Sequence, residues 1–450
     1  MSFSSLYPRQ KIILAVLFFF VFIIIVLGII VPRLSSNKVF SGQILVWGLD
    51  NKQAMAPLID AFTATYPKAK VVYEMQNVND YDKALIDAFS RGQGPDVFVV
   101  NNEKISESLP YTSPCSLSGS NDSIPACYSK KTLYTQSQLS TEFPEVVVND
   151  FTSNGLLYGL PLSVDTLGLY YNKDYFDKAN IAVPPTLWDG KSSLSVEITA
   201  RKLRQLKKLV LSRSGIALGG NSTSIENSSD ILALMMMQQG AIMKSNGQIT
   251  FDDSDSANAA IKALSFYIDF ANPKSTNNNF NWAPAAGTTD INAFWQGKTA
   301  MYLGYYRDKE FLDNYGGDFD YGYAGIPQFS SSLSTGNQVN YANYYSFVVS
   351  KQSKNIGPAW QFVMGAANYD VANRYFQITK NPPAQRSLIQ NNLDNDYSGP
   401  FVKQILTARS FSGFKSSAVI KSFDTMIYDA LHGVFLNEAI SKAARTITSY

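Results

Sequence analysis

Histidine and cysteine are nearly absent from this 450-residue chain, which has one His and two Cys. These residues cannot supply the four ligands of a structural zinc site. Charge is also scarce: 16% of the residues are charged, the net charge is +2, and there is no long basic run. These features exclude a nucleic-acid partner on electrostatic grounds.

Motifs of catalysis are lacking too. The sequence contains no G-x-S-x-G, no H-E-x-x-H and no Walker A motif, so nothing points to a serine hydrolase, a zinc protease or a nucleotide hydrolase. A glycoside hydrolase needs two carboxyl groups that flank the bond to be cleaved, and Asp50, Glu103 and Asp165 are the candidates for such a pair if they lie close together in the fold. We expect a binding module without a cofactor, and not an enzyme.

What the chain does have is one long apolar run near its beginning. Residues 12–31 read IILAVLFFFVFIIIVLGIIV, without a charge, and twenty helical residues cover roughly 30 Å of hydrocarbon. The run is longer than the apolar region of a secretory signal peptide and no A-x-A pattern follows it. We expect residues 1–38 to be a short cytoplasmic stub and a single-pass signal anchor; cleavage of this segment is the alternative.

The two cysteines lie close together in a polar segment. Cys115 and Cys127 bracket SLSGSNDSIPA, whose Ser, Gly and Pro content is typical of a surface loop. They either form a disulfide or remain two free thiols. A disulfide requires an oxidising compartment and would place the main body on the extracytoplasmic side of the membrane.

After the anchor, strand and helix patterns alternate. Strand patterns at 42–50, 69–76 and 95–103 enclose helix patterns at 56–67 and 80–94. This β-α-β-α-β order predicts parallel strands in an α/β protein, and such sheets bind ligands beyond the carboxyl ends of their strands. The residues at those ends are the first binding candidates: Trp47, Asp50, Asn101 and Glu103. A chain of this length also favours more than one lobe.

Several segments, in order, resemble one known family. They are ILVWGLD, GQGPDVFVV, YGLPLSVDTLGLYYNKDYF, INAFWQGKTAMYLGYY, YGYAGIP and VVSKQSKNIGPAWQFVMGAAN. Each is weak alone, but together they resemble the extracellular solute-binding proteins of ABC transporters, in the sugar-binding branch that includes maltose-binding protein. The resemblance runs from about residue 42 to the C-terminus.

The resemblance implies a two-lobed α/β clamshell of the periplasmic-binding-protein type (type II). Lobe I would comprise residues 39–163 and 327–379, and lobe II residues 164–326 and 380–450. The segment GLPLSVD would be the first crossing between the lobes, with Asp165 placed to accept hydrogen bonds from sugar hydroxyls.

Further site residues follow from the same likeness. Tyr305 and Tyr306 end the strand after which family members place an aromatic that stacks on the ligand, usually a tryptophan. Asn221 lies in a loop that often contacts ligand, and Tyr345 precedes a strand at the cleft edge. The full set of expected ligand contacts is Trp47, Asp50, Asn101, Glu103, Asp165, Asn221, Tyr305, Tyr306 and Tyr345.

The expected function is therefore capture of a small solute, with a saccharide favoured, and its delivery to the permease subunits of an ABC transporter by a monomer anchored in the cell membrane. Other solutes stay open, namely a polyamine, an iron complex or a peptide. A sensor or surface-interaction role also stays open, although about eleven residues before the apolar run leave no room for a cytoplasmic output domain.

Overall fold

A computed structural model describes Tyr7 and residues 40–120, 124–129, 132–208, 210–316 and 319–449. The expected membrane anchor at residues 12–31 lies outside these residues. Within the part of the chain that is described, no helix combines the length and apolar character needed to span a membrane.

One end of the molecule is organised around a five-stranded sheet with the order β2-β1-β3-β18-β9. Strands β1 (Gln43–Gly48), β2 (Lys70–Met75) and β3 (Val97–Asn101) are parallel, as predicted. Strand β18 (Tyr345–Val349) returns much later in the sequence and runs antiparallel between β3 and β9 (Gly159–Leu160). The sheet therefore joins distant parts of the chain.

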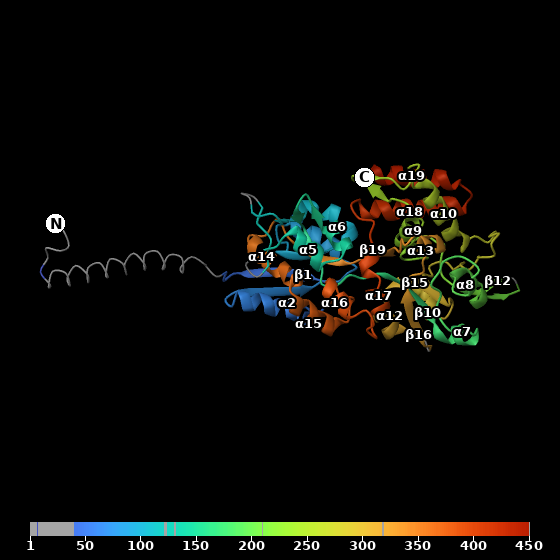
Figure 1. The fold of residues 1–450 in the computed structure, drawn as a ribbon, viewed down its shortest axis with the longest axis horizontal. Helices are drawn as coiled ribbons and strands as arrows, with labels where there is room; N and C mark the ends of the chain where they lie inside the picture. The colour runs from blue at the N-terminus through green and yellow to red at the C-terminus, as the bar shows by residue number, and fades with distance from the viewer. Residues whose placement is uncertain are drawn as a thin grey trace.

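Helices connect and cover this sheet. Helix α2 (Lys52–Thr65) begins where the Asn51 side chain accepts the Ala54 main-chain N–H at 3.0 Å, which satisfies one of the free donors of the first turn. Helix α3 (Tyr81–Ser90) leads into β3, and α14 (Ile356–Val363) and α15 (Tyr369–Thr379) pack against α2 (Figure 1). Together they enclose a first core that includes Ile44, Val46, Met55, Phe98, Val348 and Trp360.

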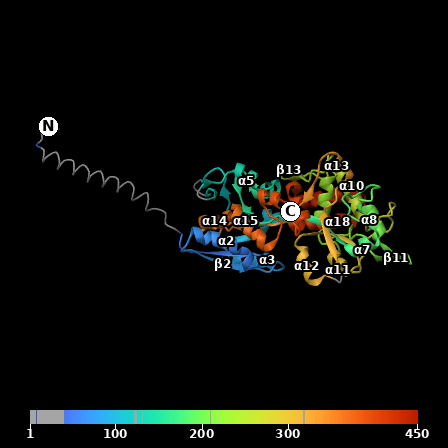
Figure 2. The ribbon, with the colours of Figure 1, turned by 60° about the horizontal axis from the view of Figure 1, so that its bottom comes forward.

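A second core lies at the other end of the molecule. Its sheet, in the order β15-β10-β16, is antiparallel and consists of β10 (Leu167–Asn172), β15 (Met301–Tyr305) and β16 (Tyr321–Gly325). Helices α9 (Ser228–Gln238), α10 (Ala257–Asp269), α18 (Ser416–Leu431) and α19 (Leu436–Thr448) pack with one another beside it. In Figure 2 the helices α10 and α18 of this second core lie to the right of α2, β2 and α3.

The remaining helices and strands are shorter and complete the two ends. The helices are α4 (Ile105–Ser108), α5 (Gln136–Glu142), α6 (Glu145–Phe151), α7 (Lys173–Lys178), α8 (Val196–Leu203), α11 (Asp290–Trp295), α12 (Asp308–Tyr315), α13 (Ser330–Ser334), α16 (Arg386–Asn391) and α17 (Gly399–Val402). The strands are β4 (Cys115–Ser116), β5 (Tyr128–Ser129), β6 (Thr132–Leu133), β7 (Thr152–Ser153), β8 (Leu156–Leu157), β11 (Gln205–Lys207), β12 (Val210–Arg213), β13 (Lys244–Ser245), β14 (Gln248–Ile249), β17 (Asn340–Tyr341) and β19 (Ala408–Arg409).

The chain passes between the cores at adjacent places. Val164 packs in the first core and Leu167 in the second, and Tyr341 packs in the second core whereas Ala342 packs in the first. Thr166 pairs with Ala342 as an isolated antiparallel bridge, and β17 pairs in parallel with β19. These crossing segments lie side by side and form the middle of the molecule.

Two stretches pack differently from the lobe boundaries expected from sequence. Val339 packs in the second core, although 327–379 was expected in lobe I. Gln238 of α9 donates through Nε2 to the Pro327 carbonyl at 3.1 Å and to the Val339 carbonyl at 3.0 Å, and the Val339 N–H donates to Gln328 Oε1 at 3.1 Å. Ile389 packs in the first core, although 380–450 was expected in lobe II. We take each core to mark a lobe, and propose crossings near residues 165, 341 and 409.

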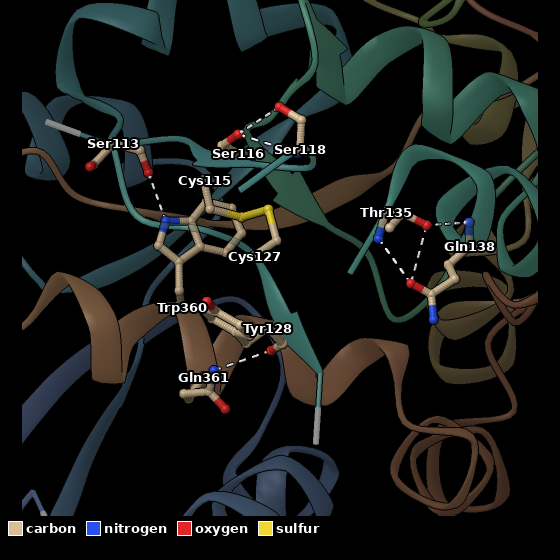
Figure 3. Close-up of a disulfide and its surroundings, with 10 residues drawn as sticks. All are labelled: Ser113, Cys115, Ser116, Ser118, Cys127, Tyr128, Thr135, Gln138, Trp360 and Gln361. Carbon is tan, nitrogen blue, oxygen red and sulfur yellow. Dashed lines mark hydrogen bonds between the residues drawn. A yellow bond between two sulfur atoms is a disulfide. The ribbon is translucent and has the colours of Figure 1, made fainter. Parts of the chain in front are cut away.

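The two cysteines form the expected disulfide, with a Cα–Cα distance of 5.1 Å. Both are fully buried, so the bridge is part of the first core and not of an exposed loop. Figure 3 shows Trp360 of α14 lying beside the bridge, where its Nε1–H donates to the Ser113 carbonyl at 3.0 Å. Gln361 donates to the Tyr128 carbonyl at 3.1 Å. The disulfide therefore closes the segment between β4 and β5, and the hydrogen bonds from Trp360 and Gln361 attach its two ends to α14.

Candidate solute-binding cleft

A cavity of about 300 Å³ lies where the two lobes and the crossing segments meet. Lobe I contributes the residues that follow β1 and the start of β18, the first crossing contributes Ser163 and Asp165, and lobe II contributes the end of β15 and the start of α12. The lining consists of Leu49, Asp50, Val78, Val99, Leu162, Ser163, Asp165, Arg307, Glu310, Asn343, Tyr344, Tyr345, Phe347, Tyr375, Asn381 and Pro382. Polar groups that converge on an apolar-walled cleft between lobes are typical of a small-molecule site.

Asp165 is fixed at the first crossing by main-chain donors. Its Oδ1 accepts the N–H of Tyr306 at 2.9 Å, and its Oδ2 accepts the N–H of Arg307 at 3.1 Å. Burial raises the pKa of this carboxyl, while the charge of Arg307 and the two N–H donors act in the opposite direction. Each oxygen retains a lone pair that a ligand hydroxyl can use.

Arg307 is the residue that the end of β15 presents to the cavity. Its guanidinium lies 4.1 Å from the centroid of the Tyr305 ring, and Nη1 donates to the main-chain and side-chain oxygens of Asn343 at 3.2 and 3.3 Å. Asn343 lies in the returning crossing, and its Oδ1 also accepts from Asn101 at 2.8 Å. Arg307 thus links lobe II to the crossing and to β3.

A second polar group lies on the lobe I wall. The Oδ2 atom of Asp50 accepts the hydroxyl of Tyr375 at 3.1 Å, and this hydroxyl accepts from Asn381 Nδ2 at 3.3 Å. The main-chain carbonyl of Asp50 accepts the hydroxyl of Tyr73. Burial raises the pKa of the Asp50 carboxyl, and the bond from Tyr375 offsets only part of that effect.

The structure brings three of the nine expected ligand residues into this cavity: Asp50, Asp165 and Tyr345. Trp47 instead packs against the first core, with its Nε1 buried and without a hydrogen-bond partner among the described residues. Asn101 lies behind the lining, where it bonds to Asn343 and accepts the Glu103 N–H at 3.1 Å. A ligand role for Trp47 and Asn101 stays a prediction.

Glu103 lies at a separate, closed contact between the lobes. Its Oε1 accepts the hydroxyl of Tyr341 at 2.7 Å, and it shares a small gap with Asp230 and Ile420. Burial, together with the charge of Asp230, raises the pKa of Glu103 well above its ordinary value. Here the carboxyl of Glu103 belongs to the interface between the lobes.

The two tyrosines expected to stack on a ligand are buried in lobe II. Tyr305 is fully buried, and its hydroxyl donates to Asp230 Oδ2 at 2.6 Å. The Tyr306 ring packs edge-on against Phe401. The tight turn after Gly304 places Asp308 against this strand, since a Cβ at Gly304 would lie 2.1 Å from an Asp308 oxygen. Arg307, and not either tyrosine, therefore faces the cavity.

Asn221 is placed away from the cavity. Its Oδ1 accepts the hydroxyl of Thr223 at 2.7 Å in a local turn, and the adjacent Ser222 donates to Asp424 of α18. The sequence missed Arg307, Asn343, Tyr375, Glu310, Ser163 and Asn381 as lining residues. Arg307 lies two residues after β15, next to the two tyrosines expected in the site. Tyr375 lies in an amphipathic helix 325 positions from Asp50, and nothing in its local sequence indicates a ligand site.

A larger cavity of about 570 Å³ lies on the other side of the crossing segments, between α6 and the end of α9. Tyr344 and Tyr345 both line the first cavity, and the Tyr344 hydroxyl donates to Asp150, which lines the second. The carboxyl of Asp150 is already bonded to Asn102, Ser410 and Ser412. We therefore take the smaller cavity, at the carboxyl ends of the parallel strands, as the candidate cleft.

This architecture is that of a clamshell solute-binding protein. It has two α/β lobes, crossing segments that lie next to one another, and a polar cleft between the lobes. The chain belongs to the family of bacterial extracellular solute-binding proteins, whose model matches residues 48–364. The family comprises binding proteins and not enzymes. This bears out the family resemblance and the extracellular placement of the main body.

Named relatives agree with this assignment. A binding protein of Brucella abortus is 25% identical over 233 residues, 51% of this chain and 51% of that protein. The multiple sugar-binding protein of Streptococcus mutans is 23% identical over 266 residues, 58% of this chain and 59% of that protein. The chain thus spans little more than half the length of these curated relatives. The cyclic α-maltosyl-1,6-maltose binding protein of Arthrobacter globiformis has the same fold, with a TM-score of 0.69 at 15% identity, covering 90% of this chain and 98% of that one.

Proposed function

We propose that this protein is an extracytoplasmic receptor that captures a small saccharide in the cleft and delivers it to an ABC transporter permease. The observation that carries the proposal is the cavity, which receives polar side chains from lobe I, lobe II and the crossing between them. A solute that contacts all three favours the form in which the lobes are closed. The sugar-binding relative of Streptococcus mutans supports the saccharide class.

The apolar run at residues 12–31 supports a further part of the proposal: it would hold the receptor at the outer face of the membrane, beside its permease. A receptor that is anchored in the membrane cannot diffuse away from it. Its effective concentration near the permease is therefore high when it carries the solute. Cell fractionation followed by an alkaline carbonate wash tests the anchor. Recovery of the protein in the washed supernatant would contradict it.

The solute class is tested by a thermal-shift screen of the full chain in a polyoxyethylene detergent, which carries neither sugar nor amine. The panel contains mono- and oligosaccharides, polyamines, amino acids and short peptides. A micromolar ligand at millimolar concentration stabilises the folded state by about 4 kcal/mol and raises the melting temperature by several degrees. A saccharide recovered chemically unchanged supports the proposal, whereas a response only to amino acids or peptides would overturn the saccharide class.

A further inference from the structure

The cleft carries more acid than base. Its lining contains three carboxyl groups, those of Asp50, Asp165 and Glu310, and a single cation, Arg307. Lys104, next to Glu103, and Lys309, next to Glu310, do not offset this excess of acid. Lys104 forms an ion pair with Asp82, and Lys309 forms one with Asp313. The lining of the cleft therefore has an excess of acidic side chains, which favours cationic solutes.

Arg307 balances the acid at the crossing and not the acid on the lobe I wall. The charge of Arg307 opposes the effect of burial on the pKa of Asp165, and the main-chain N–H of Arg307 donates to that carboxylate. Its Nη1 is committed to Asn343. No comparable cation approaches Asp50, which forms no ion pair among the residues that the structure describes.

The surroundings of Asp50 consist of neutral donors and phenol rings. Within the described residues, its only side-chain hydrogen bond comes from Tyr375 and leaves Oδ1 free. Tyr73 bonds to its main-chain carbonyl, and Tyr345 lines the same cavity. A carboxylate that has one oxygen free and only neutral groups as partners is a suitable acceptor for an ammonium group of a ligand.

Closure of the lobes makes this imbalance costly for a neutral ligand. When closure excludes water, an unpaired carboxylate loses the free energy of its hydration. Hydrogen bonds from the hydroxyl groups of a neutral sugar recover only part of that free energy. A cationic group on the ligand would pair with Asp50 and remove that penalty. A charged ligand therefore gains more from closure than its neutral analogue.

We propose that the cleft selects a saccharide that carries a positively charged amino group, and that Asp50 pairs with this amine. The inference rests on the proposed function, since it assigns the solute class of the same site. Asp165 and Asn343 would meet hydroxyl groups of the same sugar, and Arg307 would close over it from lobe II. Asp50 is thus the residue that determines specificity for the charge.

The test uses calorimetry on the full chain with matched sugars. Glucosamine, galactosamine and their β-1,4-linked oligomers serve as probes, each beside its N-acetyl and hydroxyl counterpart. We expect the free amines to bind roughly 10- to 100-fold more tightly than their neutral counterparts. In Asp50→Asn this preference should disappear, so that each free amine binds with the same affinity as its neutral counterpart. Asp255→Asn, on the exposed surface of lobe II, serves as the matched control and should keep the preference.

The outcomes separate this inference from the function on which it rests. Equal affinity for amines and neutral sugars in the wild type overturns the inference and leaves the saccharide receptor in place. A preference that persists in Asp50→Asn, with a melting curve like that of the wild type, overturns the role of Asp50. Binding of spermidine without any binding of amino sugars overturns both the saccharide class and this inference.

Discussion

Asp165 accepts the main-chain N–H of Arg307 at 3.1 Å, which bonds the first crossing between the lobes to the end of strand β15. The same carboxylate accepts the N–H of Tyr306 at 2.9 Å. Arg307 in turn donates to Asn343 in the returning crossing. One carboxylate thus determines how the cleft-facing end of lobe II is positioned relative to both crossings.

Replacement of this carboxylate should therefore weaken solute binding. We expect Asp165→Ala to lower the binding free energy by about 1–3 kcal/mol, since it removes a charged acceptor and frees two N–H donors. Isothermal titration calorimetry with the solute found in the screen measures the loss. An affinity equal to that of the wild type would remove Asp165 from the site.

Arg307 should matter for binding more than for folding. Its guanidinium faces the cavity and rests on the Tyr305 ring, so Arg307→Ala should reduce affinity at least tenfold, or about 1.4 kcal/mol, with a small change in melting temperature. Arg374→Ala is the control, because Arg374 forms an exposed ion pair with Asp60 at 2.8 Å, a kind of pair worth about 0–1 kcal/mol. If both variants bind alike, Arg307 is not a ligand residue.

Stability should fall with rising pH because of one buried acid in lobe II. Burial raises the pKa of Asp290 from 3.8 to about 8, and its Oδ2 has no hydrogen-bond partner among the described residues. Between these two values the folded state holds a proton that the unfolded chain has released, so the free energy of unfolding decreases as pH rises from about 4 to 8.

The amide Asp290→Asn removes this titration. We expect the variant to match the wild type near pH 4 and to exceed its free energy of unfolding by about 5 kcal/mol at pH 8.5. Urea denaturation at a series of pH values measures the difference, and the exposed Asp255→Asn should follow the wild-type curve. An unchanged slope in Asp290→Asn would show that other groups carry the pH dependence.

The disulfide should stabilise the first lobe without affecting the cleft. The bridge closes a short loop, with a sequence separation of 12, and both of its cysteines are buried. We expect the double variant Cys115→Ser, Cys127→Ser to lose about 2–4 kcal/mol of folding free energy. Solute affinity at a temperature well below the transition should stay the same. A loss of affinity by the folded variant would connect this segment to the site.

The sequence predicted those helices, strands and bonds whose pattern lies within one short segment. Alternating apolar patterns and their caps predicted β1, β2 and β3 with α2 and α3 between them, and the structure confirms their parallel order. Two cysteines in one short segment predicted a disulfide. Asp50 was found because it follows the carboxyl end of a parallel strand. Asp165 was found through the family resemblance of the GLPLSVD segment.

Other features depend on contacts between distant segments. The sequence favoured Tyr305 and Tyr306 for the cleft, yet the turn after Gly304 and the bond from Tyr305 to Asp230 direct both rings into lobe II, and Arg307 faces the cavity. The bonds from Gln238 of α9 to the Pro327 and Val339 carbonyls hold this stretch in the second core. No local pattern specifies such contacts.

The sequence by itself predicted the α/β class and the apolar run near the start, because periodicity and composition are local properties of the chain. It favoured a disulfide from two cysteines in one short segment, and it indicated the two-lobed family through the resemblance of several segments in order. Only the tertiary structure decided which polar groups converge. Tyr375 meets Asp50 across 325 positions, and Arg307 faces Asn343 only because two crossings lie side by side. Charge balance in a cleft is a property of this convergence, so the excess of acid around Asp50 became visible only in the folded chain.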